Sequence, residues 1–287
     1  MNKYVLFVLV AAILWGTTGT AQALSPNEST PLVIGALRLL IGGGALFLFV
    51  LFKKGISLKN LPKGSLFLGA LTMALYQPFF FSGVALTGVA IGTVVTICSA
   101  PIFAGFIEWI VYKKRPDRIW IISTALAILG CTFLFQTPTD MILNPLGVGF
   151  SLIAGFMFAM YSFVTKSLVE KYSPDVIVAI VFSFASLMLL PILFYAELSW
   201  VFEWSGALSI LHLGLIATAL AYILFARGLK RVEASTAVTL ALAEPLTASL
   251  LGIFLLKESF KFFTIVGLVV LMIGLLLLSN KERLSKA

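Results

Sequence analysis

Charged residues are scarce in this sequence. Asp, Glu, Lys and Arg together make up 11% of its 287 residues, whereas hydrophobic residues make up 60% and the mean hydropathy is +1.09. A typical soluble domain has about 25% charged residues. A chain this poor in charge cannot cover a folded surface with polar side chains. A soluble globular fold is therefore excluded, and lipid must be part of the solvent.

Cysteine and histidine are also nearly absent. Cys98 and Cys131 both lie inside apolar runs, where we interpret them as small buried hydrophobic residues, and His212 is the single histidine. The sequence has no His/Cys spacing typical of a metal site, no glycine-rich phosphate-binding motif and no nucleophile with a neighbouring base. We therefore expect no metal, no cofactor and no enzymatic activity.

Long apolar runs are what the sequence has in abundance. About 20 apolar residues cross a bilayer as a helix, and backbone polar groups inside lipid must find partners within their own segment. The runs are continuous rather than alternating, so a transmembrane β-barrel is excluded. They predict an all-α polytopic membrane protein with ten transmembrane helices: Tyr4–Ala21, Leu32–Phe52, Ser65–Gly83, Ile91–Tyr112, Ile119–Gln136, Leu146–Lys166, Val176–Tyr195, Gly206–Ala226, Ala234–Leu256 and Phe262–Ser279.

Basic residues indicate the orientation of these helices. The net charge of +8 does not indicate nucleic-acid binding, because the basic residues stand in short clusters between apolar runs. With the N-terminus inside, every Lys and Arg except Arg38, Lys257 and Lys261 falls on the cytoplasmic side or at its boundary, as the positive-inside rule favours. We predict that both termini are cytoplasmic and that the chain is a multi-pass protein of a cell membrane, in the first place a bacterial inner membrane.

The two halves of the chain are similar to each other. The stretch from Thr93 to Pro101 corresponds to the stretch from Ala237 to Pro245, and the same shift superposes Gly130 on Gly274. With five spans in each half, the second half must be inserted upside down. The sequence thus predicts two inverted five-helix repeats, residues 1–137 and 138–287. Many secondary transporters have this architecture, with the substrate near the midplane between the repeats.

The first run also has features of a secretory signal peptide. It follows Lys3 and ends near Ala21-Gln22-Ala23, which imitates a cleavage site. Cleavage there would leave nine spans and destroy the pairing of the halves, so we interpret this run as the first transmembrane helix. Within the second span, Gly42-Gly43-Gly44 is expected to permit the close approach of another helix.

Short motifs occur in a definite order along the chain. They are Leu14-Trp15-Gly16-Thr17-Thr18, Ala36-Leu37-Arg38-Leu39-Leu40, Ser99-Ala100-Pro101, Glu244-Pro245 and Leu256-Lys257-Glu258. Their order and spacing resemble the EamA-type ten-helix group of the drug/metabolite transporter superfamily. Two features depart from that group: basic residues follow the fourth span in place of an acidic one, and the sixth span lacks a tryptophan-glycine pair. The resemblance implies transport of a small metabolite, amino acids among them, with export or exchange favoured.

Ionisable residues inside a membrane are costly and usually face the protein interior. Glu244 precedes Pro245 near the middle of the ninth span and could bind a substrate amine or a proton, or serve as a structural partner. Arg38 could hold a substrate carboxylate, pair with Glu244 or extend toward the interface. His212 is a second proton-coupling candidate, although a structural role suits it better. We interpret Glu108, near the cytoplasmic end, as structural.

A cavity for an amphipathic metabolite needs apolar walls with a few hydrogen-bonding groups. The expected substrate-binding residues besides Glu244 and Arg38 are Trp15, Thr18, Tyr76, Gln77, Ser99, Tyr161 and Tyr222. We expect the first, third, fourth, sixth, eighth and ninth helices to line this cavity in a carrier that works by alternating access. A lipid-handling protein or flippase, a channel and, with less support, a membrane-embedded enzyme are the alternatives. The expected partners are a small-molecule substrate, the lipid bilayer, and a proton or exchanged metabolite; the oligomeric state stays open.

Overall fold

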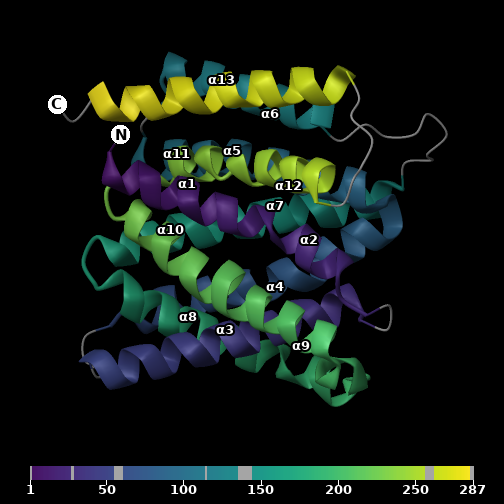
Figure 1. Cartoon of the computed structure of the whole chain (residues 1–287). Coiled ribbons are helices and arrows are strands. Elements are labelled where there is room, and N and C mark those ends of the chain that lie inside the picture. The colour runs from purple at the N-terminus through teal and green to yellow at the C-terminus, as the bar shows by residue number, and fades with distance from the viewer. Residues whose placement is uncertain are drawn as a thin grey trace.

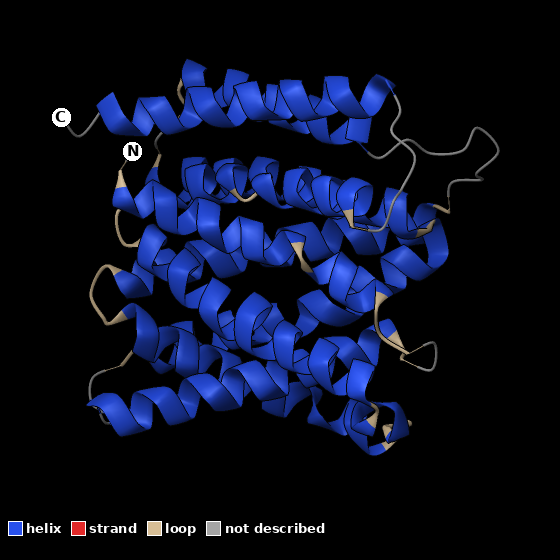
Figure 2. Ribbon diagram, in the orientation of Figure 1, coloured by secondary structure: helices blue, strands red, loops and turns tan. Residues whose placement is uncertain are grey.

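The fold is helical throughout the part of the chain that can be described. The computed structural model describes residues 2–26, 29–54, 61–113, 115–134, 144–255 and 262–284. Within these segments the regular structure is helix alone (Figure 2). Nine helical segments among the described residues are long and apolar enough to cross a membrane. The fifth expected span is represented by α6 (Arg118–Leu134), an apolar helix of 17 residues. The all-α polytopic architecture is confirmed.

The first half contains six helices that account for the first five expected spans. They are α1 (Lys3–Gly16), α2 (Thr18–Ala23), α3 (Pro31–Lys54), α4 (Lys63–Thr87), α5 (Val89–Tyr112) and α6 (Arg118–Leu134). The first span is divided at Thr17, whose Oγ1 donates a hydrogen bond to Leu14 O at 2.7 Å. α4 extends beyond its expected apolar run at both ends, because helices continue into polar residues at the membrane boundary. Lys257, Leu256 and Gln136 lie outside the described residues.

The second half contains the remaining elements. They are α7 (Pro145–Val169), α8 (Pro174–Phe194), η1 (Ser199–Phe202), α9 (Trp204–Leu211), η2 (His212–Leu220), α10 (Ala221–Leu229), α11 (Ala234–Leu240), α12 (Ala243–Phe254) and α13 (Phe262–Leu284). The start of α7 is fixed by its sequence, since Asn144 Oδ1 accepts hydrogen bonds from the backbone N–H groups of Leu146 at 3.0 Å and Gly147 at 3.2 Å. The eighth span is α9, η2 and α10 in succession, and η2 is a π-helix.

Contacts between the halves follow a symmetric pattern. α1 packs on α10, α4 on α7, α3 on α8, α5 on α11 and α6 on α13. If each span of one half is replaced by the corresponding span of the other half, the same five pairs result. In Figure 1, α6 and α13 form an outer layer on one side and α3 and α8 lie on the opposite side. The arrangement confirms two five-helix repeats. The expected division between residues 137 and 138 lies outside the described segments.

Both ends of the chain lie at the same end of the bundle (Figure 1). We call this the terminal end, where α1 begins and α13 ends, and we call the opposite end, where α2 ends and α3 begins, the distal end. Arg227 binds Asp175 at the terminal end through two hydrogen bonds of 3.0 Å. An even number of spans explains the shared location of the termini, and their cytoplasmic placement stays a prediction.

Glycines allow the closest helix contacts, as expected for Gly42 and Gly43. A Cβ on Gly42 would lie 2.7 Å from Gly214 O, and one on Gly43 would lie 2.8 Å from Phe182 O, whereas one on Gly44 would meet nothing within 4 Å. These contacts bring α3 against η2 and α8. The first two glycines of the triplet therefore carry the expected close approach, and Gly44 does not.

Candidate functional site

A cavity of about 280 Å³ lies between the two halves. Its walls come from α1 to α5 in the first half and from α7, α10, α11 and α12 in the second. All six spans that were expected to line the cavity do so, and the second span, α3, also contributes. The wall residues of α1 and α2 run from Trp15 to Gln22, and those of α4 extend to Val84, so the cavity lies toward the distal end. Its volume suits a small metabolite.

Most of the expected binding residues come together around this cavity. The lining includes Trp15, Thr18, Arg38, Tyr76, Gln77, Tyr222 and Glu244. Arg38 and Glu244 are its only charged members, and both belong to the described part of the chain. No ion pair within 4.0 Å joins these two described side chains. Neither charge is therefore neutralised by direct contact with the other.

Glu244 is positioned by a break in the ninth span. α11 ends at Leu240 and α12 begins at Ala243, with the Glu244 N–H donating to Ala241 O at 2.9 Å. Pro245 falls in the first turn of α12, where its missing N–H costs little. A carboxylate in this first turn is also favoured by the helix dipole. Gly16 lets α1 approach this backbone closely, because a Cβ on Gly16 would lie 2.7 Å from Glu244 O.

Arg38 is held by the π-helical segment. Its side chain is 9% exposed, and its Nε donates to Thr218 Oγ1 at 3.1 Å. The Thr218 hydroxyl donates in turn to Leu213 O at 2.8 Å, five residues earlier in η2. Thr218 must therefore accept from Arg38, which fixes the orientation of the guanidinium.

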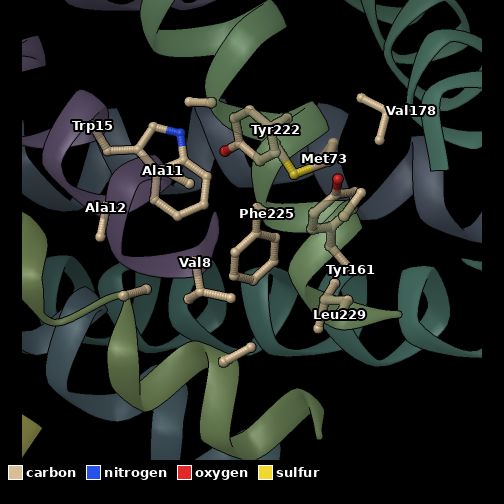
Figure 3. Packing of buried hydrophobic residues seen from close by; sticks show 14 of the residues in the cluster. Val8, Ala11, Ala12, Trp15, Met73, Tyr161, Val178, Tyr222, Phe225 and Leu229 are labelled. Carbon is tan, nitrogen blue, oxygen red and sulfur yellow. The ribbon is translucent and has the colours of Figure 1, made fainter. Parts of the chain in front are cut away.

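Aromatic rings close the cavity toward the terminal end. The Trp15 ring lies 4.8 Å from Tyr222, 5.1 Å from Phe225 and 5.8 Å from Phe158 between centroids. Figure 3 shows the rings of Tyr222 and Phe225 in the middle, with Trp15 on one side of them and Tyr161 on the other. We call Trp15, Phe158, Tyr222 and Phe225 the aromatic floor. It separates the cavity from the residues packed at the terminal end.

Three candidates do not line the cavity. Ser99 is buried and donates its hydroxyl to Thr96 O at 3.1 Å on its own helix. Tyr161 is fully buried beneath the aromatic floor, 5.7 Å from the Tyr222 ring. His212 Nε2 lies 2.7 Å from Thr17 Oγ1. Because Thr17 gives its proton to Leu14, the imidazole must donate here, which is a structural contact between η2 and the break in the first span.

Several lining residues were not anticipated. Gln22, Thr93 and Thr96 add polar groups to the wall. Gln22 was interpreted only as part of a cleavage-like tripeptide. Thr93 and Thr96 stand one helical turn apart in the repeated stretch before Pro101, and that spacing is the signal that could have indicated them. Thr96 Oγ1 also donates to Ser151 O at 3.1 Å and so joins α5 to α7.

Comparisons with known proteins assign the family. The sequence pattern described as the EamA-like transporter family matches residues 2–136 and 145–280. The uncharacterized transporter YwfM of Bacillus subtilis is 47% identical over 99% of this chain and 96% of its own. The uncharacterized inner membrane transporter YicL of Salmonella typhimurium is 28% identical over 98% and 97%. A protein of known crystal structure, 18% identical, shares the fold over the full length of both chains with a TM-score of 0.85. The chain belongs to the EamA-like transporter family and is a multi-pass transporter of the bacterial membrane.

Proposed function

We propose that the chain is a secondary carrier that exports or exchanges a small metabolite, an amino acid or similar compound first, by alternating access. The observation that carries the proposal is the cavity between the two repeats with Glu244 on its wall. Transporters built from inverted repeats bind substrate at the repeat interface, often where a membrane helix is broken. The break before Glu244 fits that pattern.

Glu244 is the group for a substrate amine or a coupling proton. It faces a cavity with mostly apolar walls, where an ammonium ion loses its hydration and a carboxylate is its natural partner. The neighbouring aromatic floor supplies ring faces for an apolar substrate side chain or for a cation. An amino acid combines these features at a size that suits about 280 Å³.

The transport cycle follows from the position of the cavity. In this conformation the cavity lies toward the distal end and the terminal end is closed, so an exported compound leaves at the distal end and an exchanged compound also enters there. The repeats, taken as residues 1–137 and 138–287, then rock so that the floor opens and the distal end closes. Because the repeats are related by symmetry, each half can adopt the conformation of the other, which supplies the second state.

Counterflow tests this proposal. Purified protein in proteoliposomes loaded with a mixture of amino acids should exchange one or more of them saturably with labelled external compound. Glu244→Gln should lower the exchange rate at least tenfold, because an amide loses the charge-assisted bond to the amine. Glu203→Gln, at an exposed carboxylate outside the cavity, is the matched control.

The outcomes separate the parts of the proposal. Exchange that Glu244→Gln leaves unchanged would keep the carrier and remove Glu244 from the binding site. Failure of folded protein to exchange any compound offered would contradict metabolite exchange and favour the lipid-handling alternative.

A further inference from the structure

Two buried donors on the cavity wall have no acceptor. Gln77 is 1% exposed and Trp15 is 4% exposed, and both line the cavity. Neither Gln77 Nε2 nor Trp15 Nε1 has a hydrogen-bond partner among the described residues. Buried donors are usually paired, because an unpaired one has lost its water without compensation. Both nitrogens have almost no accessible surface in this conformation, so each side chain must turn toward the cavity before it can donate to the acceptor oxygens of a ligand.

Arg38 adds further donors to the same wall. Its Nε is taken by Thr218, and neither of its two terminal nitrogens donates to another described residue. The guanidinium is therefore held on one side and presents its end, the geometry that receives a carboxylate through two parallel bonds. The Gln77 amide lies against the same helix, since its Oε1 is 2.9 Å from where a Cβ on Gly35 would stand, one helical turn before Arg38.

The two charged residues of the cavity wall indicate which charged groups the ligand carries. A simple amine would pair with Glu244 and leave Arg38 without a counter-ion, whereas a simple carboxylate would do the reverse. An isolated charge in a largely apolar cavity is costly. A compound with both a carboxylate and an ammonium group balances both side chains at once.

From these observations we infer that Arg38, Gln77 and Trp15 form a carboxylate subsite, so that the substrate is a zwitterion held by its carboxylate there and by its amine at Glu244. This inference rests on the proposed carrier function and names its substrate class. Thr218 is a positioning residue for the subsite, because it orients Arg38 and does not line the cavity itself.

Binding to purified protein tests the subsite independently of transport. Each of the amino acids found in proteins is tested in a thermal-stabilisation assay, and its carboxamide is tested separately. The carboxamide replaces the negatively charged carboxylate by a neutral group of similar shape. The wild type should bind at least one amino acid ten times or more tightly than the corresponding carboxamide, as expected for the loss of a charge-assisted pair.

Variants should remove this preference without removing the cavity. Gln77→Leu and Trp15→Phe keep most of the side-chain volume and should each lower the preference for carboxylate over carboxamide several-fold, and Arg38→Gln should abolish it. Trp120→Phe is the matched control for Trp15→Phe, because Trp120 Nε1 is also buried without a partner but does not line the cavity. Glu244→Gln should weaken binding and leave the carboxylate preference intact.

The result also distinguishes the subsite from the carrier. Equal binding of amino acids and carboxamides, or equal counterflow of both, would overturn the subsite and leave the carrier intact. A carboxylate preference in folded protein that performs no counterflow would support the subsite and contradict the carrier. Absence of binding and of exchange would contradict both. If Arg38→Gln does not fold, Gln77→Leu and Trp15→Phe still decide the question.

Discussion

Glu244 and Arg38 reach the cavity from different halves of the chain and form no direct ion pair. Gly16 packs closely against the backbone of Glu244, and Thr218 fixes the guanidinium of Arg38. Both charged residues could be selected from the sequence because ionisable groups are rare in apolar spans. Ser99 and Tyr161 show the limit of such reasoning. A helix that is apolar all round gives little indication of which face points inward, so polarity identified candidates but not their direction.

Exchange should depend on pH through Glu244. An ammonium group is held by the ionised carboxylate, so counterflow of an amino acid should fall as the pH is lowered through the titration of Glu244. The side chain of Gln does not titrate, so the residual counterflow of Glu244→Gln should not change with pH over the same range. The initial rate of counterflow at a series of equal internal and external pH values measures this. A parallel pH profile in both proteins would show that another group titrates.

Neighbouring glycines in α3 should respond differently to a methyl group. Gly43→Ala places a Cβ 2.8 Å from Phe182 O and should destabilise the protein by about 1–3 kcal/mol, the usual cost of overpacking. Gly44→Ala meets nothing within 4 Å and should be neutral or stabilising by up to about 1 kcal/mol. Thermal unfolding of the two variants in one detergent compares them. Equal melting temperatures would contradict the α3–α8 contact.

The apolar runs predicted where helices lie but not where they break. The first span divides at Thr17, the ninth divides between Leu240 and Ala243, and the eighth contains the π-helix η2. Pro245 was the sequence signal for the break in the ninth span. The π-helix could not be predicted. Its Gly214 and Thr218 pack against α3, a helix far away in the sequence. Local hydropathy carries no information about a partner helix.

Thr218 should link the π-helix to the binding site. Thr218→Val removes the acceptor for Arg38 Nε and leaves a buried charged donor unpaired, which costs about 1–3 kcal/mol. The variant should therefore melt at a lower temperature and also bind an exchanged amino acid more weakly. Thr218→Ser retains the hydroxyl and should preserve both properties. A Val variant with wild-type affinity would separate Thr218 from the positioning of Arg38.

The two repeats contact each other at the terminal end as well as around the cavity. The Glu108 carboxylate of α5 accepts hydrogen bonds from the backbone N–H of Ser235 at 3.1 Å and from its hydroxyl, at the start of α11. The sequence predicted a structural role for Glu108 near this end. It could not identify the partner, which belongs to the other repeat and to a different span.

Loss of this contact should favour opening at the terminal end. With Cys98→Ala and Cys131→Ala as background, spin labels at Lys113→Cys and Lys230→Cys, both exposed at this end, report the separation of the halves. Glu108→Gln weakens the bonds across the interface and should shift the distance distribution toward longer values. An unchanged distribution would show that the Glu108–Ser235 contact does not hold the terminal end closed.

If the cavity between the repeats is the transport pathway, a chemical group attached to its wall should block transport. The most direct measurement is chemical block of counterflow at Thr93, a lining residue, using Thr93→Cys in the same cysteine-free background and a membrane-impermeant thiol reagent. Thr132→Cys, exposed on α6 outside the cavity, is the control. Modification at position 93 should abolish counterflow, and the exchanged compound should protect against it, with neither effect at position 132. Full counterflow after complete modification at position 93 would contradict this pathway.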